Sequence, residues 1–355
     1  AKYNTFGVNP IARENLEKRH MRQNRLNGSL WLEFKPFEFL SYKFNGGVDL
    51  YFYENSWFRG EGNWQQNQEH RDPESQKARD NTYNMLIEHT LNFNKDFGKH
   101  HVDAVLGTTY QHHEWEGLWA SRLNFPMLGN GDYLTVLNAG QSNQQNTNSI
   151  SENAMISYLG RLNYDYKEKY ILSVAFRRDG CSRFGSNAKF ANFPSVSVGW
   201  IASDEPFMEK YDKVSHLKLR GSYGLVGNYN IGNYTYLASV GSYNYVTDGS
   251  ITAGRALSRI GNNELTWETT KQMDFGVDLG LFNDRVFLVY DYYRKWTDGL
   301  LYQIDIPYSS GFSNIQSNIG EFHFWGHEIS LETKNMVGAF KWNTQILSLI
   351  HISEP

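Results

Sequence analysis

The chain has 355 residues, a formal net charge of −4 and 15% aromatic residues. This mild charge offers no clear basic patch, so nucleic acid is not an expected partner. No apolar run reaches the roughly 18 residues that a transmembrane helix needs. The single cysteine, Cys181, cannot form an internal disulfide, so cysteine content does not indicate the redox compartment.

Apolar and polar residues alternate with a period of two through most of the chain, which predicts strands with one apolar and one polar face. In the clearest hairpin, Leu162 and Tyr164 alternate with Asn163 and Asp165. The elements predicted in chain order are a loop or short helix over 12–20 and strands over 24–35, 39–56, 83–94, 101–119, 157–166, 170–177, 193–201, 217–226, 269–282, 285–302, 320–334 and 340–349.

The connections between these strands fall into two length classes. Short turns are expected at Pro36, Asp96, Glu168, Asn283 and Val337, and long loops over 59–80, 121–153, 227–265 and 309–318, with intermediate connections around Ser186 and Glu205. Outer-membrane barrels have short periplasmic turns and long extracellular loops. We therefore predict an all-β fold, an antiparallel up-and-down transmembrane β-barrel of which about twelve strands are visible.

Polar residues that alternate with the apolar ones are candidates for the interior of such a barrel. The candidate lumen-facing residues are Arg161, Asn163, Asp165, Arg177, Lys218 and Arg220. Two explanations remain open for the cations among them. They either pair with carboxylates in a structural ladder or contact a plug or a passing substrate.

Aromatic residues on the long loops are the best candidates for contact with a substrate or a lid. Sugars stack on aromatic faces, and a protein lid needs an amphipathic rim. The candidates are Tyr229, Tyr234, Tyr236, Trp64 and Tyr133. In contrast, Trp57, Trp115 and Trp119 lie near strand ends and are better explained as interfacial anchors.

The sequence offers little for catalysis or metal binding. The pairs His100–His101 and His112–His113 consist of adjacent residues, which point to opposite faces of a strand and cannot both bind one ion. No nucleophile elbow, phosphate-binding loop or zinc-protease motif occurs. We therefore expect no enzyme activity, no catalytic residues, no metal and no cofactor.

Several motifs resemble the SusC/RagA group of TonB-dependent outer-membrane transporters. They are YLGRLNY at 158–164, RRDGCSRFG at 177–185, FPSVSVGW at 193–200, LKLRGSYG at 217–224, LTWE at 265–268 and DYY at 291–293. Cys181 stands where the family usually has serine, and Trp325 where it usually has asparagine or lysine. Neither departure disturbs the strand pattern.

The resemblance implies a barrel of about 22 strands with a plugged lumen, so the strands visible in this chain would be a partial barrel, part of a larger one. It also implies uptake of oligosaccharides or peptides, a SusD-like surface lipoprotein as lid and energy supplied through the TonB complex. On this interpretation the protein lies in the cell outer membrane of a Gram-negative, Bacteroidetes-like bacterium, in contact with its lipid. Residues 1–347 would be an internal piece of the barrel wall, with the plug domain and the TonB-contacting part absent from the chain.

The last eight residues, SLIHISEP at 348–355, resemble read-through from a sequencing adapter. We expect them to be a non-native tail.

Two other functions also fit the strand pattern. A small passive outer-membrane porin or adhesin would pair the first strand with the twelfth. A secreted glycan-binding β-sandwich would pack its apolar faces against each other.

Overall fold

The computed structural model describes residues 10–61 and 72–354. Within these residues a single antiparallel sheet of twelve strands dominates. Its strands, in spatial order, are β1 (Glu17–Phe37), β2 (Leu40–Arg59), β3 (Glu74–Phe97), β4 (His100–Leu123), β5 (Ser142–Tyr166), β6 (Tyr170–Cys181), β7 (Phe190–Ile201), β8 (Val214–Asn228), β13 (Glu268–Leu281), β14 (Val286–Asp298), β17 (Glu321–Val337) and β18 (Lys341–Glu354). The predicted number of strands and their antiparallel arrangement are confirmed.

Other elements are few and short. They are the helix α1 (Pro10–Leu16), the 3-10 helices η1 (Leu137–Ala139), η2 (Ala202–Asp204), η3 (Pro206–Lys210) and η4 (Tyr308–Ser310), and three two-stranded sheets. Among the described residues, no helix is long and apolar enough to cross a membrane.

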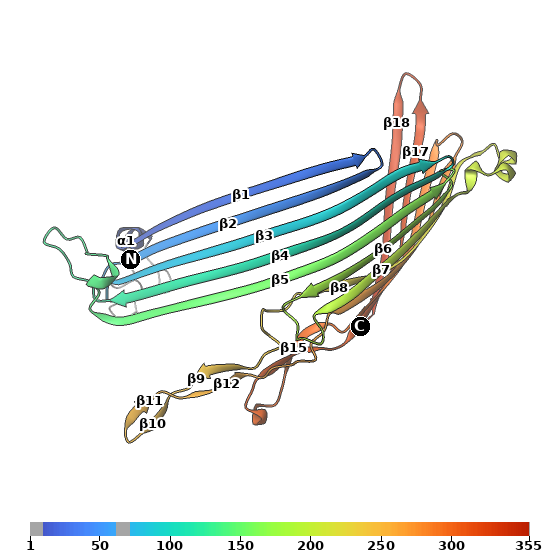
Figure 1. The fold of residues 1–355 in the computed structure, drawn as a ribbon. Helices are drawn as coiled ribbons and strands as arrows, with labels where there is room; N and C mark the ends of the chain where they lie inside the picture. The colour runs from blue at the N-terminus through green and yellow to red at the C-terminus, as the bar shows by residue number, and fades with distance from the viewer. Residues whose placement is uncertain (1–9, 62–71, 355) are drawn as a thin grey trace. The chain divides into compact units, whose positions relative to one another are not determined.

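The chain divides into two compact units. One comprises Ala1–Leu30, Gly46–Leu86 and Gln111–Asn153, and the other comprises Trp31–Asn45, Ile87–Tyr110 and Ala154–Pro355. Strands β1 to β5 lie side by side in chain order and contribute residues to both units (Figure 1).

Consecutive strands are joined by two kinds of connection, as predicted. Short turns join β1 to β2, β3 to β4, β5 to β6, β13 to β14 and β17 to β18, and residues 202–213 join β7 to β8. Because the strands are antiparallel and follow chain order, all these connections lie at one end of the sheet, the short-turn end. The other connections lie at the opposite end, which we call the loop end.

The register of the ladder separates the two faces of the sheet. One rung contains Leu162, Val174, Val196, Tyr223 and Met273. The next rung contains Asn163, Ser173, Ser197, Ser222 and Asp274. Neighbouring rungs point to opposite sides of a sheet, so these strands have an apolar face and a polar face.

The apolar face is exposed rather than packed against a second layer. Val198 is 56% exposed and Phe176 is 48% exposed. On β5 this face runs from Tyr158 to Tyr166, which corresponds to about 27 Å along the strand. An outer-membrane barrel carries an outward apolar band about 25 Å tall with aromatic residues at its borders. The exposed face rules out the β-sandwich alternative, which required apolar faces packed together.

The sheet also differs from the small closed barrel. That alternative required the first strand to pair with the twelfth. In the part of the chain that the structure describes, the strand order begins with β1 and ends with β18, and no pairing joins these two strands.

Two predicted loops are partly strands. The expected loop over 59–80 gives its last residues to β3, which begins at Glu74, while residues 62–71 lie outside the described part of the chain. The expected loop over 121–153 gives residues 142–153 to β5. These segments are polar on both faces, so they lack the alternation that marks a half-buried strand. Backbone pairing with neighbouring strands satisfies their peptide groups, and most side chains of residues 142–153 are exposed.

The other two predicted loops fold into hairpins at the loop end. The segment 227–265 contains β9 (Ser239–Ser242) paired with β12 (Arg255–Arg259), and β10 (Tyr245–Thr247) paired with β11 (Ser250–Thr252). Figure 1 shows the β10–β11 hairpin continuing from the β9–β12 pair. The loop predicted over 309–318 lies largely within a second hairpin of β15 (Leu301–Asp305) and β16 (Asn314–Asn318).

Residues 348–354 belong to β18. Ser348 pairs with Ile329 of β17, and Glu354 pairs with His323. The predicted tail therefore continues the last strand of the described sheet.

Candidate functional site

A buried cluster at the loop end joins residues of three sequence motifs, RRDGCSRFG, FPSVSVGW and LTWE. We call it the loop-base cluster, and it consists of Cys181, Phe184, Phe193, Ile231, Leu265 and Trp267. Phe184 and Leu265 are completely buried. Phe184 comes from the RRDGCSRFG motif and Trp267 from LTWE, and their ring centroids lie 5.2 Å apart. These two motifs, separated by about 80 residues of sequence, thus form one packing unit at the base of the long loops.

Trp267 is the centre of this cluster. Its ring also lies 5.5 Å from that of Phe193, and its indole Nε1 donates a hydrogen bond to the carbonyl oxygen of Lys189 at 3.2 Å. A buried tryptophan usually needs such a partner for its N–H. The ring therefore attaches the segment before β13 to the connection between β6 and β7.

Polar residues outside the cluster also hold the base of the long loops in place. Glu268 accepts hydrogen bonds from the side chain of Asn228 on β8 and from the backbone N–H of Leu301, both at 3.2 Å. Asn318 accepts from the N–H of Thr266 and donates to its carbonyl oxygen, both at 2.8 Å. The ends of both long excursions are thereby tied to the sheet.

The three candidate tyrosines of the 227–265 excursion have different surroundings. The Tyr229 ring packs edge-on against Trp267, with 5.5 Å between centroids, and the Arg183 guanidinium lies 5.5 Å from the centroid of the Tyr229 ring. Tyr236 also packs against the loop-base cluster. Tyr234 is exposed and has a positive φ of 60°. Of the three, Tyr234 presents the most side-chain surface to solvent. Their role in substrate or lid contact stays a prediction.

The loop candidate Tyr133 belongs to the first unit. Tyr133 packs against Phe58 with 5.2 Å between ring centroids, and its hydroxyl accepts a hydrogen bond from the N–H of Glu61 at 3.3 Å. Trp64 lies outside the described residues. Tyr133 thus connects two loop segments that are about 70 residues apart in sequence.

All six candidate lumen-facing residues lie on the polar face by register. The most connected of them is Arg220 on β8. Its Nη2 lies 2.8 Å from an oxygen of Asp278 and 2.9 Å from an oxygen of Asp291. One guanidinium therefore links β8, β13 and β14. A Cβ at Gly276 would collide with Asp291 and with Arg220, so only glycine leaves room for this bridge.

Other polar-face candidates are held within the ladder. Arg177 donates through Nε to Asp179 at 2.7 Å and through Nη2 to Ser157 at 2.9 Å. Asn163 donates to Asp103 at 2.9 Å and accepts from Ser173 at 2.6 Å. These contacts support the structural-ladder explanation for Arg177.

Arg161, Asp165 and Lys218 share the polar face but have a different environment. Lys218 pairs in register with Asp278, whose carboxylate is already bound by Arg220. Arg161 lines a hollow of about 500 Å³ together with Arg177. The structure therefore brings Arg161 and Arg177 to one hollow and places Arg220 in a separate cluster.

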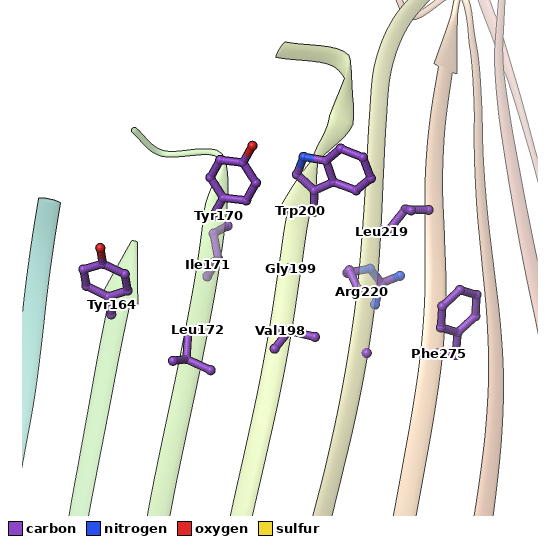
Figure 2. A pocket seen from close by; sticks show the side chains of 11 residues that line it. Tyr164, Tyr170, Ile171, Leu172, Val198, Gly199, Trp200, Leu219, Arg220 and Phe275 are labelled. Carbon is purple, nitrogen blue, oxygen red and sulfur yellow. The ribbon is translucent and has the colours of Figure 1, made fainter. Parts of the chain in front are cut away.

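The apolar face ends at the short-turn end in an aromatic pair. Figure 2 shows Tyr170 and Trp200 near the ends of β6 and β7, beside a hollow of about 490 Å³ that also includes Val198 and Phe275. The Tyr170 hydroxyl donates to Glu205 at 2.7 Å, and Trp200 Nε1 donates to the same carboxylate oxygen at 3.3 Å. This pairing fixes both rings at the border of the apolar face.

The Glu205 contacts predict an acid-dependent stability. The hydrogen bond from Tyr170 and, to a smaller extent, the one from Trp200 favour the charged carboxylate, so they lower the pKa of Glu205. A lowered pKa contributes stability that is present above the unfolded-state pKa and is lost as the pH falls through the folded-state pKa. We expect the melting temperature of the wild type to exceed that of Glu205→Gln near neutral pH. This difference should shrink as the pH is lowered to about 3. A difference that is independent of pH would contradict the assignment.

Comparison with known proteins decides the family. Residues 2–351 match the family described as "TonB dependent receptor-like, beta-barrel". The chain belongs to this family. The chain is 37% identical over 265 residues to "TonB-dependent receptor P3" of Formosa agariphila, and the match covers 74% of this chain and 26% of that protein. It is 29% identical over 267 residues to "TonB-dependent receptor SusC" of Bacteroides thetaiotaomicron, and the match covers 74% of this chain and 26% of that protein.

Among solved structures, the structure of this chain resembles that of the RagAB peptide transporter. The TM-score is 0.80 at 26% identity, and the match covers 95% of this chain and 38% of that one. The SusC/RagA resemblance predicted from the motifs is thus confirmed. The chain spans about a quarter of the length of the curated relatives that it matches.

Sequence reasoning missed the residues that hold the site together. Phe184 and Trp267 were noted only as parts of family motifs, and Glu205 only as part of a connection. Their partners lie far away in sequence, so no local pattern identifies them. A signal was nevertheless available, because a tryptophan within a loop segment usually packs against something.

Proposed function

We propose that this receptor is part of the wall of an outer-membrane transporter that imports a nutrient with energy delivered through TonB. The observation that supports this most is the register, which gives one wide sheet an exposed apolar face and a polar face. In a barrel the apolar face contacts outer-membrane lipid and the polar face lines the lumen. No catalytic role is proposed.

The proposed cargo is an oligosaccharide or a peptide. The similar RagAB structure is described as that of a peptide transporter, which supports the peptide. The polar face carries both signs of charge, as in Arg177 beside Asp179, and this suits a zwitterionic or polar solute. The hollow beside Arg161 and Arg177 is the proposed place of contact.

The proposed partner at the loop end is a SusD-like surface lipoprotein. Tyr234, Tyr243 and Tyr245 are exposed there, and Val246 and Ile251 at the tip of the β10–β11 hairpin are more than 70% exposed. Exposed apolar groups surrounded by polar residues are typical of a surface that binds another protein. The TonB complex would act on parts of the protein outside this chain.

An uptake experiment tests the proposal. Cells that express the full-length protein are given fluorescent peptide and oligosaccharide pools, with and without a protonophore, and beside a strain that lacks TonB. We expect uptake of one pool only, and its loss in the protonophore-treated cells and in the TonB-deficient strain. Uptake that continues without the proton gradient would instead indicate a passive pore.

A further inference from the structure

A histidine and two glutamates converge on β4 and β5, away from the loop-base cluster and the Arg220 network. His112 and Glu114 are two residues apart on β4, so they share one face of that strand, and Glu152 reaches them from β5. Their ligand atoms all lie within 4.8 Å of one another. His112 Nε2 is 3.6 Å from Glu114 Oε2.

The charges of this group are not compensated by other side chains. Across residues 10–61 and 72–354, no lysine or arginine forms an ion pair with Glu114 or Glu152. Two carboxylates at this separation repel each other. Like charges that face each other across a ladder are destabilising. A bound cation would remove this repulsion.

We propose that His112, Glu114 and Glu152 bind one divalent transition-metal ion, of which Zn²⁺ fits best. Zinc takes one imidazole nitrogen and two carboxylate oxygens at about 2.0–2.2 Å, which places ligand atoms about 3.4 Å apart in a tetrahedral site. The observed 3.6 Å between His112 and Glu114 is close to that spacing. The imidazole favours zinc over calcium or magnesium, which prefer oxygen ligands.

The expectation of no metal rests on the two pairs of adjacent histidines and on the lack of a zinc-protease motif in the sequence. His113 does point elsewhere, since its Nδ1 lies 2.6 Å from Asn84 Oδ1. The ligand set instead combines His112 with the second residue along its own strand and with a residue about 40 positions away on the next strand. The fourth coordination position is open to water. An ion held in this way joins β4 to β5 and stabilises their pairing, because it binds the folded state only.

The test uses the full-length protein in detergent, freed of metal with a chelator and titrated with Zn²⁺ by calorimetry. We expect the wild type to bind one equivalent more than the double variant Glu114→Gln/Glu152→Gln. The single variant Glu152→Gln should weaken Zn²⁺ binding by more than about tenfold, since even outer partners of metal ligands contribute that much. Zn²⁺ should also raise the melting temperature of the wild type more than that of Glu152→Gln.

The matched control is Glu116→Gln, which removes a carboxylate from the same face of β4 outside the cluster. It should bind Zn²⁺ as the wild type does. Glu152 is exposed, so its replacement by glutamine leaves the fold intact and any loss of binding is specific. Equal stoichiometry and equal affinity in the wild type and in Glu152→Gln would overturn the proposal.

Discussion

Replacing Trp267 with alanine is expected to destabilise the loop end of the sheet by about 3 kcal/mol or more, the usual cost of removing a large buried aromatic side chain. Trp267 is only 6% exposed and contacts Phe184, Phe193 and Tyr229. Its removal leaves a cavity where three segments meet. Amide hydrogen exchange should therefore increase in residues 182–189 and 229–236, well before the rest of the sheet opens.

Two variants make this result specific. Trp267→Phe keeps an aromatic ring in the cluster but loses part of the buried ring volume and the hydrogen bond to Lys189, so it should cost about 1–2 kcal/mol, less than the alanine variant. Trp342→Ala removes an exposed tryptophan on β18 and should change stability by less than about 0.5 kcal/mol. Equal exchange rates in the wild type and in Trp267→Ala would show that the cluster does not hold the loops.

The second large effect is expected for Arg220→Ala, which should lower the free energy of unfolding by about 2–3 kcal/mol. Removing one partner of a buried ion pair leaves an uncompensated charge, which costs about 3–5 kcal/mol. The lower value applies because the Arg220 side chain is 31% exposed and water screens part of the repulsion. Urea unfolding of the full-length protein in detergent measures the change.

Removing the opposing charges should reverse that loss. In an Arg220→Ala background, replacing Asp278 and Asp291 with asparagine removes the two carboxylates that Arg220 binds, so most of the stability should return. Arg25→Ala is the matched control, because its bidentate pair with Asp49 is 63% exposed on the arginine side. It should cost less than about 1 kcal/mol. If the asparagine replacements do not rescue Arg220→Ala, the network is not electrostatic in origin.

Most of the sheet could be predicted from sequence because a sheet with one apolar and one polar face imposes a strict period of two. Leu162 to Asp165 show the reason, since a shift of one residue would turn every apolar side chain to the polar side. The same rule placed Arg177 and Arg220 on one face. Turn positions followed as well, because each short connection interrupts the alternation.

The period fails where neither face contacts an apolar environment. Residues 142–153 are nearly all polar, yet they form half of β5, since pairing with a neighbouring strand needs no alternation. The surroundings of Tyr229 and Tyr236 were equally hidden. A tyrosine is suited both to a packed cluster and to a solvent-exposed binding surface. Which of the two it occupies depends on contacts with residues that are distant in sequence. The convergence of Glu152 on His112 likewise depends on the register of two strands.

The excursion between β8 and β13 leaves the sheet at Asn228 and returns to it at Glu268, and these two residues are direct partners in the ladder. Only its two ends, near Ile231 and Leu265, pack into the loop-base cluster. Strand β9 pairs with β12 and strand β10 pairs with β11, in two small sheets that are separate from the twelve-stranded sheet. Doubling the length of a closed loop costs only about 0.6 kcal/mol. The β9–β12 and β10–β11 hairpins can therefore be lengthened, shortened or replaced, in evolution or by engineering, while the register of the twelve-stranded sheet stays the same.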